Sequence, residues 1–189
     1  MIVLASGSPR RRELLTMLGI SDFRILPAKG EEIVPEGVGP AETVMALARA
    51  KAQEVAACSE KDDVIIAADT IVWIDGEILG KPKTAGQAHQ MLRLLSGRTH
   101  KVYTGVCVIR GDAEELESEC TEVRFRELSD AEIDAYIATG EPMDKAGAYG
   151  AQGKAALFVE GIDGDFFNVM GLPLCRLGQM LGKQGVTLL

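Results

Sequence analysis

The sequence predicts an α/β protein, because short apolar strands alternate with amphipathic helices along its length. Residues 64–74 are apolar on both faces, as is typical of a buried, central strand. Three long helices are expected, over residues 40–58, 84–95 and 129–139. Hairpins are expected where strands meet at turn dipeptides, which are Asp75-Gly76, Gly111-Asp112 and Asp163-Gly164.

The N-terminal residues 1–18 combine a strand, a turn and a helix start. Residues 1–5 are a short apolar strand, Ser6-Gly7-Ser8 is a small-residue turn, and Pro9 suits the first helical position after an N-cap at Ser8. Arg10, Arg11 and Arg12 fill the first turn, where the helix dipole disfavours each cation by roughly 0.3–1 kcal/mol. These features favour an oligophosphate site. A solvated arginine cluster is the alternative.

Three charged residues interrupt apolar or rigid segments. Asp69 lies inside the 64–74 strand, where a carboxylate is costly unless a cation or metal pairs it, so we interpret it as functional rather than as a structural ion pair. Lys51 falls on the apolar stripe of the 40–58 helix, and a snorkelling lysine is the alternative there. Lys81 follows the first hairpin in Gly80-Lys81-Pro82, whose spacing excludes a P-loop.

The C-terminal third begins with an unusual loop at residues 144–154. Glycines and alanines there surround single polar groups, so the backbone could approach a ligand closely, with a flexible connector as the alternative. Residues 155–161 and 165–170 are expected to form a last hairpin. A closing helix is expected from Gly171-Leu172-Pro173.

Composition excludes several classes of protein. A net charge of −8 disfavours binding to nucleic acid or to anionic membranes. No segment approaches the roughly 18 apolar residues of a membrane span, and the N-terminus does not resemble a signal peptide. The four cysteines lack any C-x-x-C spacing and predict free thiols in a reducing compartment. We therefore expect a cytoplasmic protein with no membrane or nucleic-acid partner.

The remaining residues suit phosphoryl chemistry. With only two histidines and no G-x-S-x-G motif, a Ser-His-Asp hydrolase is disfavoured, and the lack of G-x-G-x-x-G disfavours a dinucleotide fold. Cations and oxygen ligands of the kind that hold Mg²⁺ remain, at Arg10, Arg11, Lys51, Lys81, Glu31 or Glu32, and Asp69. Hydrolysis of a phosphoanhydride needs such a mixture, with a carboxylate to orient or deprotonate water.

Six motifs in register resemble those of the Maf family. They are Leu4-Ala5-Ser6-Gly7-Ser8-Pro9-Arg10-Arg11, Ala68-Asp69-Thr70-Ile71-Val72, Gly80-Lys81-Pro82, Ser96-Gly97-Arg98-Thr99-His100, Asp144–Gly153 and Gly171-Leu172-Pro173-Leu174. The resemblance covers essentially the whole chain. It implies one domain over residues 1–189, with two lobes around a central cleft and an elongated mixed sheet flanked by helices, similar to inosine-triphosphate pyrophosphatases.

The resemblance also implies an activity. Maf proteins are nucleoside triphosphate pyrophosphatases that cleave between the α- and β-phosphates and need a divalent metal, Mg²⁺ or Mn²⁺. By this resemblance Asp69 is the proton acceptor, and Arg10, Thr70 and Gln152 set base preference. This combination is similar to the branch acting on dTTP and UTP rather than on 7-methyl-GTP, and the family suggests a homodimer.

A mechanism joins these roles as a hypothesis. Gln152 offers one amide donor and one acceptor, which suit a uracil or thymine edge. The triphosphate would be held by Ser8, Arg11, Lys51 and Lys81. The metal would be held by Glu32 and Asp69.

Two other functions stay open. A related house-cleaning enzyme would use the same chemistry on purine or modified nucleotides. A nucleotide-binding regulator of septum formation would bind nucleotide with little catalysis. A substrate panel scored for pyrophosphate release separates the three.

Overall fold

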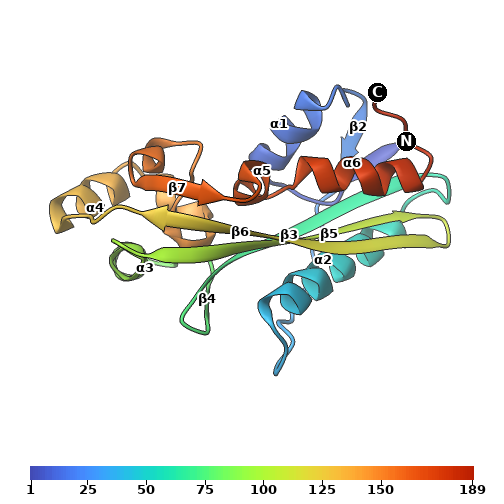
Figure 1. Ribbon diagram of the computed structural model, residues 1–189. Helices are drawn as coiled ribbons and strands as arrows, with labels where there is room; N and C mark the ends of the chain where they lie inside the picture. The colour runs from blue at the N-terminus through green and yellow to red at the C-terminus, as the bar shows by residue number, and fades with distance from the viewer. The chain divides into compact units, whose positions relative to one another are not determined.

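The computed structural model describes residues 1–189 and contains a seven-stranded sheet flanked by helices (Figure 1). Its strand order is β2-β1-β3-β5-β6-β7, and β4 pairs with β3. The strands are β1 (Ile2–Leu4), β2 (Phe23–Ile25), β3 (Val64–Ile74), β4 (Glu77–Leu79), β5 (Thr99–Arg110), β6 (Ala113–Phe125) and β7 (Val159–Asp163). β1 runs parallel to β2 and β3, whereas β4 and β7 are antiparallel to their partners β3 and β6, so the sheet is mixed.

The helices follow most of the boundaries expected from the sequence. They are α1 (Pro9–Met17), α2 (Pro40–Ala56), α3 (Ala85–Leu95), α4 (Asp130–Ile137), α5 (Phe166–Met170) and α6 (Leu174–Lys183), with three short 3₁₀ segments η1 (Glu141–Asp144), η2 (Ala146–Ala148) and η3 (Lys154–Leu157). Ser8 is the N-cap of α1 and Pro9 its first residue, as predicted. Ser129 and Glu132 form a capping box at α4. No helix combines the length and hydropathy needed to traverse a bilayer.

The chain divides into two compact units. The first unit comprises Met1–Asp69, Thr104–Glu119 and Gly171–Leu189, and the second comprises Thr70–Tyr103 and Cys120–Met170. Strands β3, β5 and β6 each contribute residues to both units. The two units are described separately below.

Close packing of α2 against β5 organises the first unit. A Cβ atom added at Gly105 in β5 would lie 2.2 Å from the carbonyl oxygen of Val44 in α2, so only glycine fits at this distance. Small residues of α2 continue the contact into an apolar cluster of Val3, Ala5, Ala48, Ala52, Val55, Ile65, Ala67, Cys107 and Ile109. This packing fixes the face of α2 that carries Lys51.

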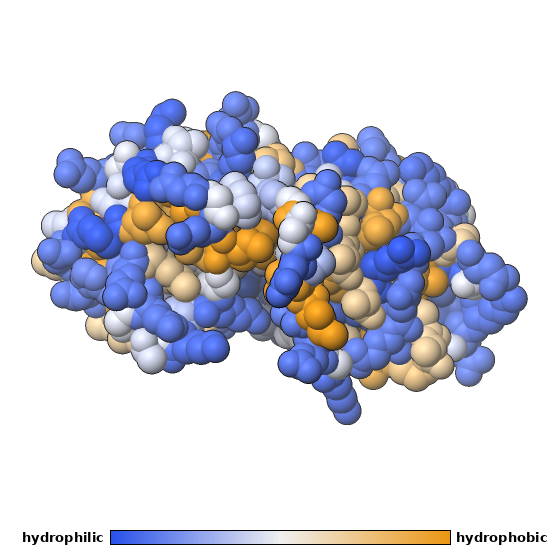
Figure 2. All heavy atoms as spheres, turned by 90° about the horizontal axis from the view of Figure 1, so that it is seen from below, coloured by the Kyte–Doolittle hydropathy of each residue, from blue (hydrophilic) through white to orange (hydrophobic).

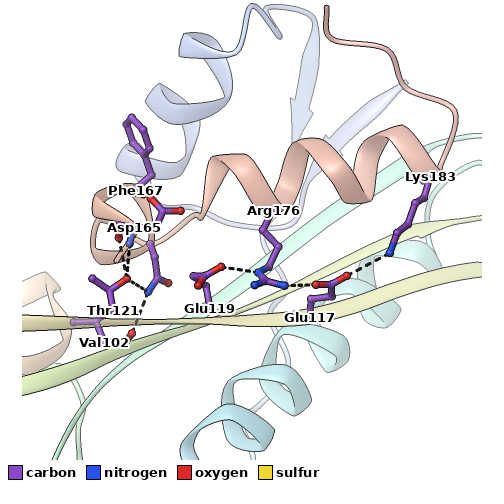
Figure 3. A network of polar contacts seen from close by, with 9 residues as sticks. Val102, Glu117, Glu119, Thr121, Asp165, Phe167, Arg176 and Lys183 are labelled. Atoms are coloured by element: carbon purple, nitrogen blue, oxygen red, sulfur yellow. Dashed lines mark hydrogen bonds and ion pairs between the residues drawn. The ribbon is translucent and has the colours of Figure 1, made fainter. Parts of the chain in front are cut away.

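Ion pairs tie α6 to β6 within the first unit (Figure 3). Arg176 contacts Glu117 and lies 2.7 Å from Glu119, and Lys183 lies 2.9 Å from Glu115. The three glutamates alternate along β6 and therefore share one face of the strand. Each ion pair is partly exposed and contributes little stability alone, so the attachment of α6 to β6 depends on the whole network.

Aromatic rings fill the core of the second unit. His100, Phe125, Tyr136, Tyr149 and Phe158 pack edge to face, with ring centroids 4.8–6.1 Å apart. The helices α3 and α4 pack against each other in this unit. In the view of Figure 2 the surface is largely hydrophilic, with apolar side chains gathered in several patches.

Residues Phe166–Met170 form the helix α5, so the strand predicted for residues 165–170 is wrong. Asp165 Oδ1 accepts the Phe167 N–H at 2.7 Å, which satisfies a donor at the helix start. Thr121 Oγ1 holds the Asp165 backbone on both sides, by accepting its N–H at 3.1 Å and donating to its carbonyl at 3.0 Å (Figure 3). The preceding strand is also shorter than expected, because η3 occupies residues 154–157 and β7 pairs with β6 instead.

Candidate active site

An ammonium group between two carboxylates forms the centre of the site in the first unit. Lys51 Nζ lies 2.6 Å from Asp69 Oδ1 and 2.7 Å from Glu32 Oε1. The side chains of Lys51 and Asp69 are only 18% and 11% exposed, whereas that of Glu32 is 60% exposed. Lys51 is therefore an ion-pair partner inside the apolar stripe and does not snorkel to solvent.

Three different elements supply these charges. Asp69 belongs to β3 and Lys51 to α2, whose stripe residues Val44, Leu47, Ala48 and Val55 are buried as predicted. Glu32 lies on the exposed segment that links β2 and α2. The start of this segment is fixed by Glu54, whose carboxylate accepts the Lys29 and Gly30 N–H groups at 2.7 and 3.0 Å. These backbone hydrogen bonds lower the pKa of Glu54.

The guanidinium of Arg11 is oriented by two acceptors in the same unit. Arg11 Nε donates to the Gly171 carbonyl at 2.8 Å, and Nη1 donates to Ser6 Oγ at 3.1 Å. Burial lowers the pKa of Arg11, and the negative charge of Asp69 opposes that shift. The charge of Arg10 also lowers this pKa, while Arg12 is exposed. The three arginines therefore differ, and Arg11 is the one oriented by the turn.

Ser6 is a site residue that the motif analysis did not single out. Its hydroxyl oxygen accepts the Ser8 N–H at 3.3 Å as well as the Arg11 guanidinium, so one side chain organises the turn before α1. The hydroxyl of Ser8 does not cap α1. The sequence signals for Ser6 are its place in a small-residue turn and in the first family motif. Its hydrogen bond with Arg11 leaves no separate signal, because the two become neighbours only when the helix forms.

The second unit contains Thr70, Lys81 and Gln152. Thr70 is half-buried in β3, and both Lys81 and Gln152 are exposed. The turn that precedes Lys81 meets the glycine-rich loop, since the Gly147 N–H donates to the Gly80 carbonyl at 3.1 Å. Gly147 has a φ of +67°, and an added Cβ would lie 2.8 Å from Val72, so this close approach requires glycine.

The loop at residues 144–154 folds into short 3₁₀ segments and a turn, with residues 147–151 buried. It is therefore a packed part of the second unit and not a loose connector. Two further residues that sequence reasoning missed, Tyr136 and Glu141, contact this loop through hydrogen bonds. No periodic pattern marks them, because these bonds link separate segments.

The candidate metal ligands are a pair of carboxylates. No group of three or more His, Cys, Asp or Glu side chains converges anywhere in the chain. Glu32 and Asp69 nevertheless approach one common cation, the ammonium of Lys51. All four cysteines are free, as the sequence predicts.

Comparison with known proteins settles the family. A family model described as "Maf-like protein" matches residues 1–184. The chain belongs to the Maf family. A protein of Thermococcus gammatolerans named dTTP/UTP pyrophosphatase is 56% identical over 174 residues, which cover 92% of this chain and 91% of that protein. A protein of Bacillus cytotoxicus with the same name is 51% identical over 175 residues, covering 93% and 91%.

Two solved structures show the same fold as this Maf chain at low sequence identity. The Staphylococcus aureus Ham1 protein has a TM-score of 0.51 and 14% identity, and the match covers 97% of this chain and 98% of that one. A HAM1 protein from Coxiella burnetii has a TM-score of 0.51 and 17% identity, covering 96% and 98%. The α/β fold with a mixed sheet flanked by helices, expected from the sequence, is thereby confirmed.

Proposed function

We propose that this chain is a nucleoside triphosphate pyrophosphatase that hydrolyses dTTP and UTP to the nucleoside monophosphate and pyrophosphate. Membership of the Maf family supports the chemistry, and relatives named dTTP/UTP pyrophosphatase support the substrates. The observation that carries most weight is Asp69, a nearly buried carboxylate that is held by the ammonium of Lys51. A buried carboxylate beside cations suits the activation of water next to phosphate groups.

Asp69 takes a proton from the attacking water in this proposal, and nearby cations offset the charge of the triphosphate. Arg11 is suited to phosphate, because two of its donors are already fixed by Gly171 and Ser6 and its fork is thereby oriented. The remaining phosphate contacts are proposed for Ser8 in the turn before α1 and for the cations Lys51 and Lys81. These groups act by orientation and electrostatic stabilisation, the main sources of catalysis in phosphoryl chemistry.

The two carboxylates fit a divalent metal. Glu32 and Asp69 direct oxygens toward one cation, Lys51 Nζ, at 2.7 and 2.6 Å. Mg²⁺ typically takes one or two carboxylates and completes its shell with water and substrate phosphates, so a third protein carboxylate is not required. Glu32 and Asp69 would hold Mg²⁺ or Mn²⁺, which when bound offsets charge on the phosphates.

Base preference is assigned to Gln152, Arg10 and Thr70. Gln152 presents an exposed amide with one donor group and one acceptor, which matches a uracil or thymine edge. Arg10 and Thr70 complete the set through the family resemblance. The protein is further proposed to be a cytoplasmic homodimer that does not bind nucleic acid. The acidic composition disfavours nucleic acid, the free cysteines suit a reducing compartment, and the homodimer rests on the family resemblance.

A panel of nucleoside triphosphates tests the function. Pyrophosphate release is measured with Mg²⁺, with Mn²⁺ and after metal removal, and dTTP and UTP are expected to exceed CTP, purine and modified nucleotides. Release only from purine or modified nucleotides would favour the house-cleaning alternative. Nucleotide binding without pyrophosphate release under any metal condition would favour a regulatory protein.

A further inference from the structure

Gln152 sits in a tight turn that fixes the backbone from which its side chain extends. The Gly153 N–H donates to the Gly150 carbonyl at 3.0 Å, which closes a turn with Ala151 and Gln152 as its central residues. Ala151 is 6% exposed, whereas Gln152 is exposed. One central residue is thus anchored in the core, and the next presents its amide to solvent.

A tyrosine and a glutamate hold both ends of this turn. The Tyr136 hydroxyl, on α4, accepts the Gly150 N–H at 3.2 Å and donates to Glu141 Oε1 at 2.9 Å. The other oxygen of Glu141, Oε2, accepts the Lys154 N–H at 3.1 Å. Burial raises the pKa of Tyr136 above its usual range, so its hydroxyl stays neutral and keeps its proton to donate. One continuous set of hydrogen bonds therefore brackets Gln152.

The carboxylate of Glu141 also touches the backbone next to Gln152. A Cβ added at Gly153 would lie 2.3 Å from Glu141 Oε1, so the two groups are in direct contact. The backbone of Glu141 is also fixed, since Lys145 Nζ donates to its carbonyl at 2.8 Å. Neither the turn nor Glu141 can shift without breaking one of these contacts.

We propose that Tyr136 and Glu141 are positioning residues for base selection, which act by fixing the turn that carries Gln152. This inference rests on the proposed function, because it needs Gln152 to contact the base. It assigns part of the substrate preference to side chains that never touch the nucleotide. The competing view is that the two residues only stabilise the second unit.

Two variants test the proposal, Tyr136→Phe and Glu141→Gln. Phe removes one oxygen and keeps the ring packing, whereas Gln keeps the shape but faces the Lys154 N–H with less acceptor capacity. Each is expected to raise KM for UTP about tenfold, to leave kcat within about twofold, and to lower the UTP-to-CTP ratio of kcat/KM about tenfold.

A double-mutant cycle with Gln152→Ala separates positioning from general stability. If both residues act through Gln152, they are expected to change selectivity no further in the Gln152→Ala background. Inhibition by inorganic pyrophosphate, which lacks a base, is expected to stay unchanged in every variant. Glu160→Gln, which alters an exposed pair with Arg124 in the same unit, is the matched control and is expected to behave as wild type.

Three results would overturn the inference. Additive losses in the Gln152→Ala background would show a structural role, as would single variants that keep the wild-type UTP-to-CTP ratio. A Gln152→Ala enzyme with unaltered selectivity would overturn both the inference and the proposed reading of the base. If Glu141→Gln fails to fold, Tyr136→Phe alone decides the question through the same cycle.

Discussion

The two units position functional groups in different ways. In the first unit the candidate groups are charged, and they are held by charge, as in the contacts of Lys51 with Asp69 and Glu32. In the second unit the turn that carries Gln152 is held through its backbone, by hydrogen bonds of Gly150 with buried Tyr136 and of Lys154 with Glu141. Under the proposed function, Asp69, Lys51 and Arg11 would serve the phosphates, and Gln152 would serve the base.

Phosphates and bases require different environments from a protein. A phosphate responds to nearby cations and metals over several ångströms, so an ionic cluster serves it even when the chain moves slightly. A base edge responds only to a donor or acceptor at hydrogen-bond distance, so the amide that meets it needs a rigid mount. Variants of Asp69 and Arg11 should therefore change rate and phosphate binding, and variants around Gln152 should change selectivity.

The largest effect is expected for Asp69→Asn. The amide keeps the shape of the side chain but removes the base, so pyrophosphate release is expected to fall by roughly 10²–10⁴-fold. Circular dichroism and thermal unfolding check that the fold is retained. Asp63→Asn is the matched control, since Asp63 is also a buried acid of the first unit, 3.6 Å from Arg24, and its loss should leave the rate unchanged. Wild-type turnover by Asp69→Asn would refute the role of this residue.

The next largest effect is expected for Lys51→Met, and it concerns the free energy of unfolding. The change leaves the nearly buried Asp69 without its ammonium partner and is expected to lower the free energy of unfolding by about 3 kcal/mol. If Glu32 and Asp69 hold a metal, Mg²⁺ should then stabilise this variant more than it stabilises the wild type. Thermal unfolding with and without Mg²⁺ measures both effects.

The exposed pair of Lys61 and Asp112 supplies a control for Lys51. Lys61 and Asp112 are 76% and 94% exposed, so Lys61→Met should change stability little and should show no Mg²⁺ dependence. Equal responses of the two lysine variants to Mg²⁺ would argue against a metal at Glu32 and Asp69.

An effect that depends on pH is expected in the second unit. His100 is 2% exposed, its Nε2 lies 2.7 Å from the Tyr149 hydroxyl, and burial lowers its pKa to about 4. The unfolded chain takes up this proton near pH 6.5, so the stabilisation is complete above about pH 6.5 and is lost as pH falls toward 4. His100→Gln should flatten the stability profile between these values, as measured by thermal unfolding across this pH range. If His100→Gln kept the wild-type dependence of stability on pH, His100 would be excluded as its cause.

The smallest effect is expected from a pair of arginine variants. Arg11→Lys loses the fork that Gly171 and Ser6 orient, so KM for UTP is expected to rise about tenfold. Arg12 is exposed, and Arg12→Lys should leave KM within about twofold. Steady-state kinetics on UTP decides between them, and equal KM values would remove the distinction between the two arginines.

Features governed by local chemistry could be predicted from the sequence. The strand at residues 64–74, the hairpin at Asp75-Gly76 and the N-cap at Ser8 all follow from side-chain periodicity and turn preferences, and the structure confirms them. The unusual position of Lys51 could also be seen in the sequence, because it places a charge on the apolar face of a predicted helix. The family motifs added candidate site residues that the periodicity of apolar side chains does not reveal.

Features that depend on distant partners could not be predicted. The segment 165–170 is apolar enough for a strand, and it becomes helical where Asp165 meets Thr121, 44 residues away. The acceptors of Arg11 include the Gly171 carbonyl, 160 residues away in the sequence. The support of Gln152 by Tyr136 likewise depends on how α4 packs beside the loop. Such contacts are consequences of tertiary structure and leave no local pattern.

The absence of a side chain at Gly105 should affect which variants of this protein remain active. Because α2 presses directly on Gly105, any side chain there would push the helix away from β5 and carry Lys51 with it. A library of variants selected for turnover should therefore retain glycine at this position as strictly as it retains Asp69. Selection at Gly105 would reflect the short distance between the backbones of α2 and β5. Gly105 should therefore not be counted as a catalytic residue on the ground that it is retained.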